Sequence, residues 1–88
     1  MAIKLIIYGK VHGVGFRYFV YKNAIKYNVK GYVKNNPDGT VEAWFEGEKE
    51  NIDKIIELCK KGPERARVDK IDIFNVEDKG YEEFKIIK

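Results

Sequence analysis

Two segments of this chain have one apolar face each at helical spacing, and strand-like segments flank both of them. The first predicted helix runs from Arg17 to about Asn28. Its apolar face is formed by Phe16, Phe19, Val20, Ala24 and Tyr27. The second runs from Glu48 to Lys61, with lysines in its last turn and Gly62-Pro63 as a stop signal. Because each helix has a single apolar stripe, both need a sheet to cover it.

Alternation of apolar and polar residues predicts the strands around these helices. The strand-like segments are residues 3–8, 29–34, 41–46, 68–76 and 81–87. A Pro37-Asp38-Gly39 turn joins the second and third of them into a hairpin. The order β-α-β-β-α-β with one extra strand predicts a ferredoxin-like split βαβ sandwich, an α+β fold with both helices on one face of an antiparallel sheet. The length, 88 residues, predicts a single domain over residues 1–88.

Cysteine, histidine and charge limit the chemistry. The chain has one Cys and one His, too few for a tetrahedral zinc site, so we expect no metal and no cofactor. Cys59 shares the apolar stripe of the second helix and is expected to be a buried structural thiol. The formal net charge of +3 is modest and mixed with acidic residues, which permits an anionic ligand without requiring nucleic acid.

The apolar stretches are all interrupted by Lys or Glu, so we expect no membrane span. No secretory leader is recognisable after Met1, and a cytoplasmic location and a monomer are the expectations. Abundant Lys, Glu and Ile without Gln indicate a thermophilic source, although the Asn residues weaken that inference.

A glycine-rich segment, Gly9 to Arg17, joins the first strand to the first helix. Glycine permits φ > 0, so successive backbone N–H groups can turn around an anion at the positive end of the helix. The segment is neither a Walker A loop nor a dinucleotide fingerprint. Taken alone, Gly13 and Gly15 more often serve only to turn a strand into a helix.

Arg17 favours an anion site over that simple turn. A cation in the first helical turn faces the positive end of the helix dipole, which costs about 0.3–1 kcal/mol at an exposed site. A guanidinium is also well shaped to hold two phosphate oxygens at once. An unfavourable charge beside a glycine loop indicates that an anion binds there.

Two further polar residues remain open to two interpretations. His12 could donate to the same anion or could be a solvated loop residue, with equal weight. Asn35 ends a strand beside a turn, where Asn commonly serves turn geometry, so residue logic alone favours a structural role. Antiparallel packing could bring Asn35 near the glycine loop, but spacing in one sequence does not prove it.

Two motifs make the chain resemble the acylphosphatase family. The first is Gly9-x-Val11-x-Gly13-Val14-Gly15-Phe16-Arg17, and the second is Gly31-Tyr32-Val33-Lys34-Asn35-x-x-x-Gly39-x-Val41. They fall on the strand-to-helix loop and on the hairpin, and the resemblance extends over nearly the whole chain. It implies a hydrolase that needs no metal and converts acyl phosphates to carboxylate and inorganic phosphate, which would also inhibit it.

The resemblance also implies a role for each site residue. The backbone of His12, Gly13, Val14, Gly15 and Phe16, together with Arg17, would bind the phosphate group. Asn35 would position the attacking water. One departure is visible, because this chain has His12 where the family most often has Gln. Since the phosphate is bound by backbone amides, the change bears on binding strength and pH dependence more than on reaction type.

Two alternatives of another class use the same fold. The first is an RNA-binding module, because Tyr8, Tyr32 and Trp44 alternate away from the aliphatic residues and could stack bases on an open sheet face. The pattern of RNA-binding aromatic and basic residues is missing, however, and the net charge is small, so no nucleic-acid partner is expected. The second is a regulatory anion-binding domain without turnover, which loss of Arg17 or Asn35 would have indicated.

Overall fold

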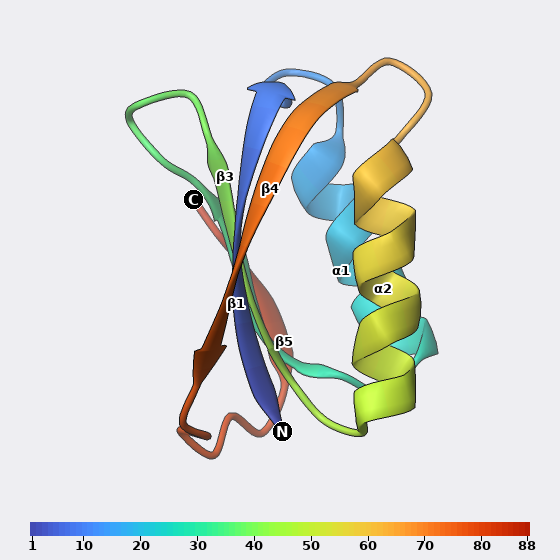
Figure 1. Cartoon of the computed structure of the whole chain (residues 1–88), viewed down its shortest axis with the longest axis vertical. Helices are drawn as coiled ribbons and strands as arrows, with labels where there is room; N and C mark the ends of the chain where they lie inside the picture. The colour runs from blue at the N-terminus through green and yellow to red at the C-terminus, as the bar shows by residue number, and fades with distance from the viewer.

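Five strands and two helices form two layers in the computed structural model, which describes residues 1–88. The strands are β1 (Ala2–Lys10), β2 (Lys30–Asn35), β3 (Val41–Glu46), β4 (Arg67–Val76) and β5 (Phe84–Ile87). The helices α1 (Phe16–Lys26) and α2 (Lys49–Lys61) cover one face of the sheet, as Figure 1 shows. The predicted ferredoxin-like α+β sandwich with one extra strand is confirmed.

The sheet has the strand order β4-β1-β3-β2-β5 and is mixed rather than wholly antiparallel. Three pairings are antiparallel, but β5 runs parallel to β2. The expectation of an antiparallel sheet is therefore wrong for this one pair. The segment 77–83 carries the chain from β4 at one edge, along the end of the sheet, to the opposite edge (Figure 1). A strand that starts there must run in the direction of β2.

The core lies between the sheet and the two helices. Leu5 and Ile7 of β1 are fully buried, together with Val20 of α1 and Ile52 and Ile55 of α2. The helical spacing predicted from the sequence therefore faces the sheet. Neither helix is long and apolar enough to cross a membrane.

Cys59 belongs to the same core, as predicted. Its side chain is fully buried in α2. Burial raises the pKa of the thiol to about 12. At neutral pH this sulfur is therefore protonated and packed, and it is no candidate nucleophile.

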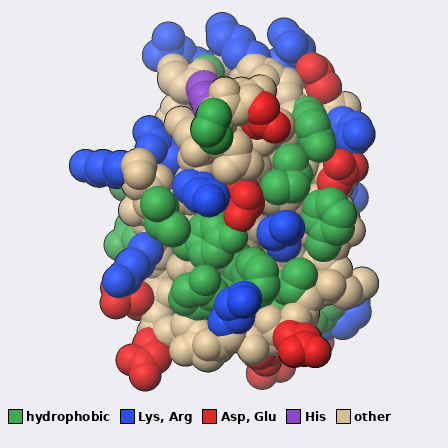
Figure 2. Space-filling view, turned by 90° about the vertical axis from the view of Figure 1, so that its left-hand side faces the viewer, with side chains coloured by type: hydrophobic (Ala, Val, Ile, Leu, Met, Phe, Trp, Pro, Cys, Tyr) green, Lys and Arg blue, Asp and Glu red, His purple; other side chains and the backbone are tan.

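The helix-free face of the sheet carries aromatic side chains that cover one another. Figure 2 shows hydrophobic side chains interleaved with basic and acidic side chains on this face. Tyr32 stacks on Trp44, and Tyr81 packs edge-on against both rings. Trp44 is only 7% exposed, and Lys79 lies over its ring. Base stacking needs open ring faces, so this arrangement does not favour the RNA-binding alternative.

A buried carboxylate, Glu46 at the end of β3, anchors the segment that leads into β5. Glu46 is 7% exposed and accepts hydrogen bonds from the Trp44 indole and from the backbone N–H groups of Lys79, Gly80 and Tyr81. These amides point at the carboxylate and not at a neighbouring strand. This explains why β5 begins at Phe84, three residues later than the alternation predicts.

Glu46→Gln is expected to destabilise the protein, mainly at neutral pH. Burial raises the pKa of the Glu46 carboxyl, but the hydrogen bonds from Lys79, Trp44, Tyr81 and Gly80 outweigh this, and the net pKa is lowered. The carboxylate thus stabilises the fold above the pKa of the unfolded chain, and this contribution is lost as the pH falls through the lower folded value. An amide cannot accept all four bonds, so the free energy of unfolding should fall by about 1–3 kcal/mol at pH 7.

Urea unfolding of Glu46→Gln and of the wild-type chain, from pH 7 to below about pH 4, measures this loss. The difference between the two proteins should shrink as the pH falls. Glu82→Gln, an exposed neighbour on the same segment, serves as the matched control and should change little. A difference that stays constant with pH would contradict a role for the Glu46 charge.

Candidate active site

Three strands have their C-terminal ends at the same end of the sheet, and the glycine-rich loop lies beside them. β1 and β2 both pair antiparallel with β3, and β5 is parallel to β2, so all three point the same way. In Figure 1, β1 ends at the top, where the chain turns into the loop that enters α1, and β5 runs upward to the C-terminus. A hollow of about 430 Å³ opens there. Its lining includes Gly13, Gly15, Arg17, Asn35, Ile86 and Lys88.

The loop before α1 presents backbone N–H groups without acceptors. Gly13 and Gly15 have φ values of 70° and 77°, in the left-handed region that glycine adopts without strain. No N–H from His12 to Tyr18 donates a hydrogen bond within the chain. The N-cap residue of α1 supplies no side-chain cap, and its first turn has no acidic residue. This set of donors at a helix N-terminus matches the requirements of a bound anion.

Arg17 projects into the same hollow from the first turn of α1. Its side chain is half-buried, and it takes no part in the ion pairs or side-chain hydrogen bonds of the chain. No Asp or Glu lines the hollow. The guanidinium therefore sits near the positive end of a helix without a carboxylate to compensate it. An anionic ligand would supply that compensation.

Asn35 lines the same hollow as Arg17, from the last position of β2. Its Oδ1 atom is the one buried side-chain polar atom in the chain that has no hydrogen-bond partner. Burying a polar atom without a partner costs about 1–3 kcal/mol, so such atoms call for an explanation. The structure thus brings Arg17 and Asn35 into one hollow, which spacing in the sequence could not establish. The turn role belongs to Asn36, whose N–H donates to the Thr40 carbonyl at 2.9 Å.

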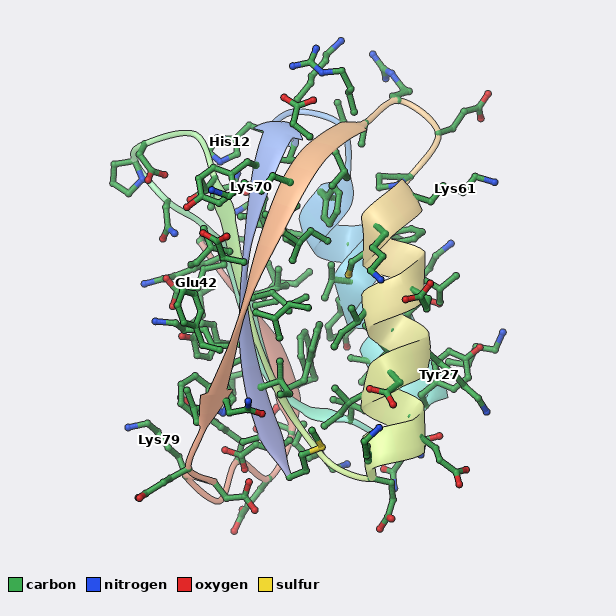
Figure 3. All side chains as sticks on the ribbon, in the orientation of Figure 1. His12, Tyr27, Glu42, Lys61, Lys70 and Lys79 are labelled. Atoms are coloured by element: carbon green, nitrogen blue, oxygen red, sulfur yellow. The ribbon has the colours of Figure 1, made fainter.

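His12 makes a contact that neither sequence interpretation included. Its Nε2 lies 2.8 Å from the backbone carbonyl oxygen of Thr40, in the loop between β2 and β3. Figure 3 shows His12 beside this hairpin, at the end of the sheet. The imidazole is therefore a link between two loops. Its backbone N–H remains among the unpaired donors of the glycine loop.

Sequence reasoning did not find the contribution of the chain's C-terminal residues to the hollow. Ile86 and Lys88 line it because β5 lies parallel to β2 and ends at the same edge. Tyr18 also lines it, and its ring stacks on Tyr21 of the next helical turn. No signal in the sequence places the last residues beside Arg17. No group of three or more His, Cys, Asp or Glu side chains is arranged to hold a metal ion.

Comparison with known proteins agrees with these features. The family model for acylphosphatase matches residues 3–86. An acylphosphatase from Methanothrix thermoacetophila is 40% identical over 87 residues, which cover 99% of this chain and 97% of that protein. One from Thermococcus kodakarensis is 45% identical over 83 residues, covering 94% and 91%. The crystal structure of an acylphosphatase from Bacillus subtilis superposes with a TM-score of 0.95 at 35% identity, covering 99% of this chain and 98% of that one. This chain belongs to the acylphosphatase family.

Proposed function

We propose that this acylphosphatase hydrolyses the carboxyl–phosphate bond of small acyl phosphates with the residues of the hollow described above. Residues 12–17, here called the phosphate loop, hold the phosphate group. Asn35 orients the water that attacks phosphorus. The observation that carries this proposal is that one hollow is lined by loop residues with unpaired N–H groups, by the uncompensated Arg17 and by Asn35 with its unpartnered Oδ1. The loop residues Gly13, Gly15 and Phe16 line it, whereas His12 and Val14 do not.

The phosphate loop and Arg17 supply charge stabilisation. Phosphoryl transfer needs little covalent help from the protein, because charge spread over the phosphate oxygens is the main thing to stabilise. Backbone N–H groups from His12 to Phe16 can donate to these oxygens without reorganising. Arg17 can donate to two oxygens at once from its planar fork. These contacts would hold the phosphate both before and during the reaction.

Asn35 orients the attacking water. Its Oδ1 accepts a hydrogen bond from water, which leaves an oxygen lone pair of that water free to point at phosphorus. Holding the nucleophile in line with the leaving group removes part of the entropic barrier. The position of Asn35 at the end of a paired strand makes it a rigid support, since Asn35 and Val41 are partners in the β2–β3 ladder.

The departing group needs no acid from the protein. Water oxygen bonds to phosphorus as the bond from phosphorus to the acyl oxygen breaks, and the acyl group leaves as a stable carboxylate. The proton released by water passes to an oxygen of the phosphate product. No Asp or Glu lines the hollow to take this proton. His12 Nε2 donates to Thr40, and the His12 side chain is not among the residues that line the hollow.

Hydrolysis of benzoyl phosphate in excess EDTA is the direct test. We expect inorganic phosphate to be released at an undiminished rate with EDTA, and also after alkylation under native conditions, because Cys59 is buried. Loss of activity on chelation, restored by added metal, would refute the metal-independent mechanism.

We further propose that residues 1–88 act as one domain and as a monomer. Light scattering, which gives the molar mass in solution, tests the monomer.

Inorganic phosphate is expected to bind the phosphate loop, to compete with substrate and to raise the melting temperature. A ligand that binds only the folded state stabilises it by about 2.7 kcal/mol at a hundred times its Kd. In an NMR titration the amide signals of Gly13 to Arg17 should move, while those of Tyr32 and Trp44 should not. Shifts confined to Tyr32 and Trp44 would instead place the anion on the aromatic face.

A further inference from the structure

We propose that His12 is a positioning residue, which ties the phosphate loop to the hairpin that carries Asn35. The inference rests on the proposed function, because it assumes that Arg17 and Asn35 act on one substrate from two separate elements. Its basis is the hydrogen bond between the His12 ring and Thr40. No other hydrogen bond joins residues 12–17 to residues 36–40.

The direction of this hydrogen bond follows from its partners. The Thr40 carbonyl oxygen can only accept, so His12 Nε2 carries a hydrogen and donates across 2.8 Å. The neutral Nε2–H tautomer and the imidazolium both donate from this nitrogen. The Nε2–H group of His12 therefore links the two loops.

Thr40 is a rigid attachment point. Its side chain is buried, with the residue only 5% exposed. The Asp38 carboxylate accepts from both the backbone N–H and the hydroxyl of Thr40, at 3.0 and 2.7 Å. The backbone N–H of Asn36 donates to the same Thr40 carbonyl that His12 contacts. A hairpin loop held by so many local bonds cannot drift independently of the strands it connects.

The attachment point also lies next to the proposed catalytic residue. The Thr40 carbonyl belongs to the peptide bond that leads into Val41, and Val41 is the ladder partner of Asn35. A bond at this carbonyl thus fixes the phosphate loop relative to the backbone directly opposite Asn35. Gly13 and Gly15 have left-handed backbone angles and, as glycines, a wider choice of conformations than other residues, so an external link helps to hold one loop conformation.

The test compares His12→Leu, which cannot donate, with His12→Gln, whose side-chain amide can. Turnover of benzoyl phosphate by the full chain should fall about tenfold or more in His12→Leu, because small misplacements of reacting groups are costly. The kcat should fall more than KM rises, since the loop amides and Arg17 are retained. His12→Gln should recover most of the lost kcat. His12→Asn is polar but too short to reach Thr40, so its kcat should fall as much as that of His12→Leu. It replaces the leucine variant in the comparison if that variant folds poorly.

A double-mutant cycle with Asn35→Ala tests whether His12 acts through Asn35. Once Asn35 is truncated there is no water-orienting group to misplace, so His12→Leu should then lower kcat by less than about threefold. Near-normal kcat in His12→Leu, equal losses in His12→Gln, or fully multiplicative losses in the cycle would each overturn the proposal. Normal kcat in Asn35→Ala alone would instead refute the proposed role of Asn35, and with it any action of His12 through that residue.

Discussion

Arg17→Ala is expected to lower kcat/KM for acyl phosphates by about two to three orders of magnitude and to weaken inhibition by phosphate. That is the usual scale for losing one strong contact to the charge of a transition state. Arg17 is uncompensated by any carboxylate in the chain, so its removal should not unbalance an internal ion pair. Folding stability should stay level or rise, because a cation leaves the positive end of α1.

Two further variants serve as comparisons for Arg17→Ala. Arg17→Lys keeps the charge but not the planar fork, and it should restore little activity. Arg65→Ala removes an equal charge from an exposed arginine that forms no ion pair, and it should leave kcat/KM nearly unchanged. Steady-state kinetics with benzoyl phosphate and phosphate inhibition constants measure all three. Equal losses in Arg17→Ala and Arg65→Ala would point to general electrostatic attraction and not to a phosphate contact at Arg17.

Local patterns predicted most of the fold. Helical and strand periodicities are patterns within short segments, so the sequence alone shows them. The apolar faces of α1 and α2 could be recognised because these faces pack against the core. One predicted boundary moved for a local reason and another because of a long-range contact. α1 ends at Lys26 because the chain reaches a left-handed conformation at Asn28, with φ of 56°. β5 starts late because Glu46, more than thirty residues earlier, takes the amides of Lys79, Gly80 and Tyr81.

The candidate site likewise has one part that a local sequence pattern predicts and another part that depends on distant segments meeting. Glycines before a helix and an arginine in its first turn are a local signal, since together they contradict the helix dipole unless an anion is present. The partners across the hollow carry no such local signal, and only the resemblance of the second motif indicated Asn35. Asn35, Ile86 and Lys88 reach it only because β2 and β5 run in parallel to the same edge. The hydrogen bond from His12 to Thr40 likewise depends on the meeting of two loops, which no periodicity encodes.

Asn35→Ala is expected to separate orientation of water from binding of phosphate. The variant should keep KM and the phosphate inhibition constant close to the wild-type values, because Arg17 and the loop amides are intact. The kcat should fall about a hundredfold, because a water that is not held in line loses its favourable geometry. A selective loss of kcat marks an interaction that is made mainly in the transition state.

If Asn35 had the structural role that sequence logic favours, Asn35→Ala would lower the melting temperature and leave the kcat of the folded enzyme unchanged. We expect the opposite. Asn36 already serves the turn, and Asn35 Oδ1 has no partner in the chain, so its removal relieves a buried unpaired atom and should not lower the melting temperature. Asn75→Ala, at an exposed strand position on β4, controls for the loss of an asparagine from the sheet. Circular dichroism and thermal melts check the fold of both variants. If a well-folded Asn35→Ala enzyme kept near-normal kcat, water would be oriented by another group, and the unpaired oxygen would need a different explanation.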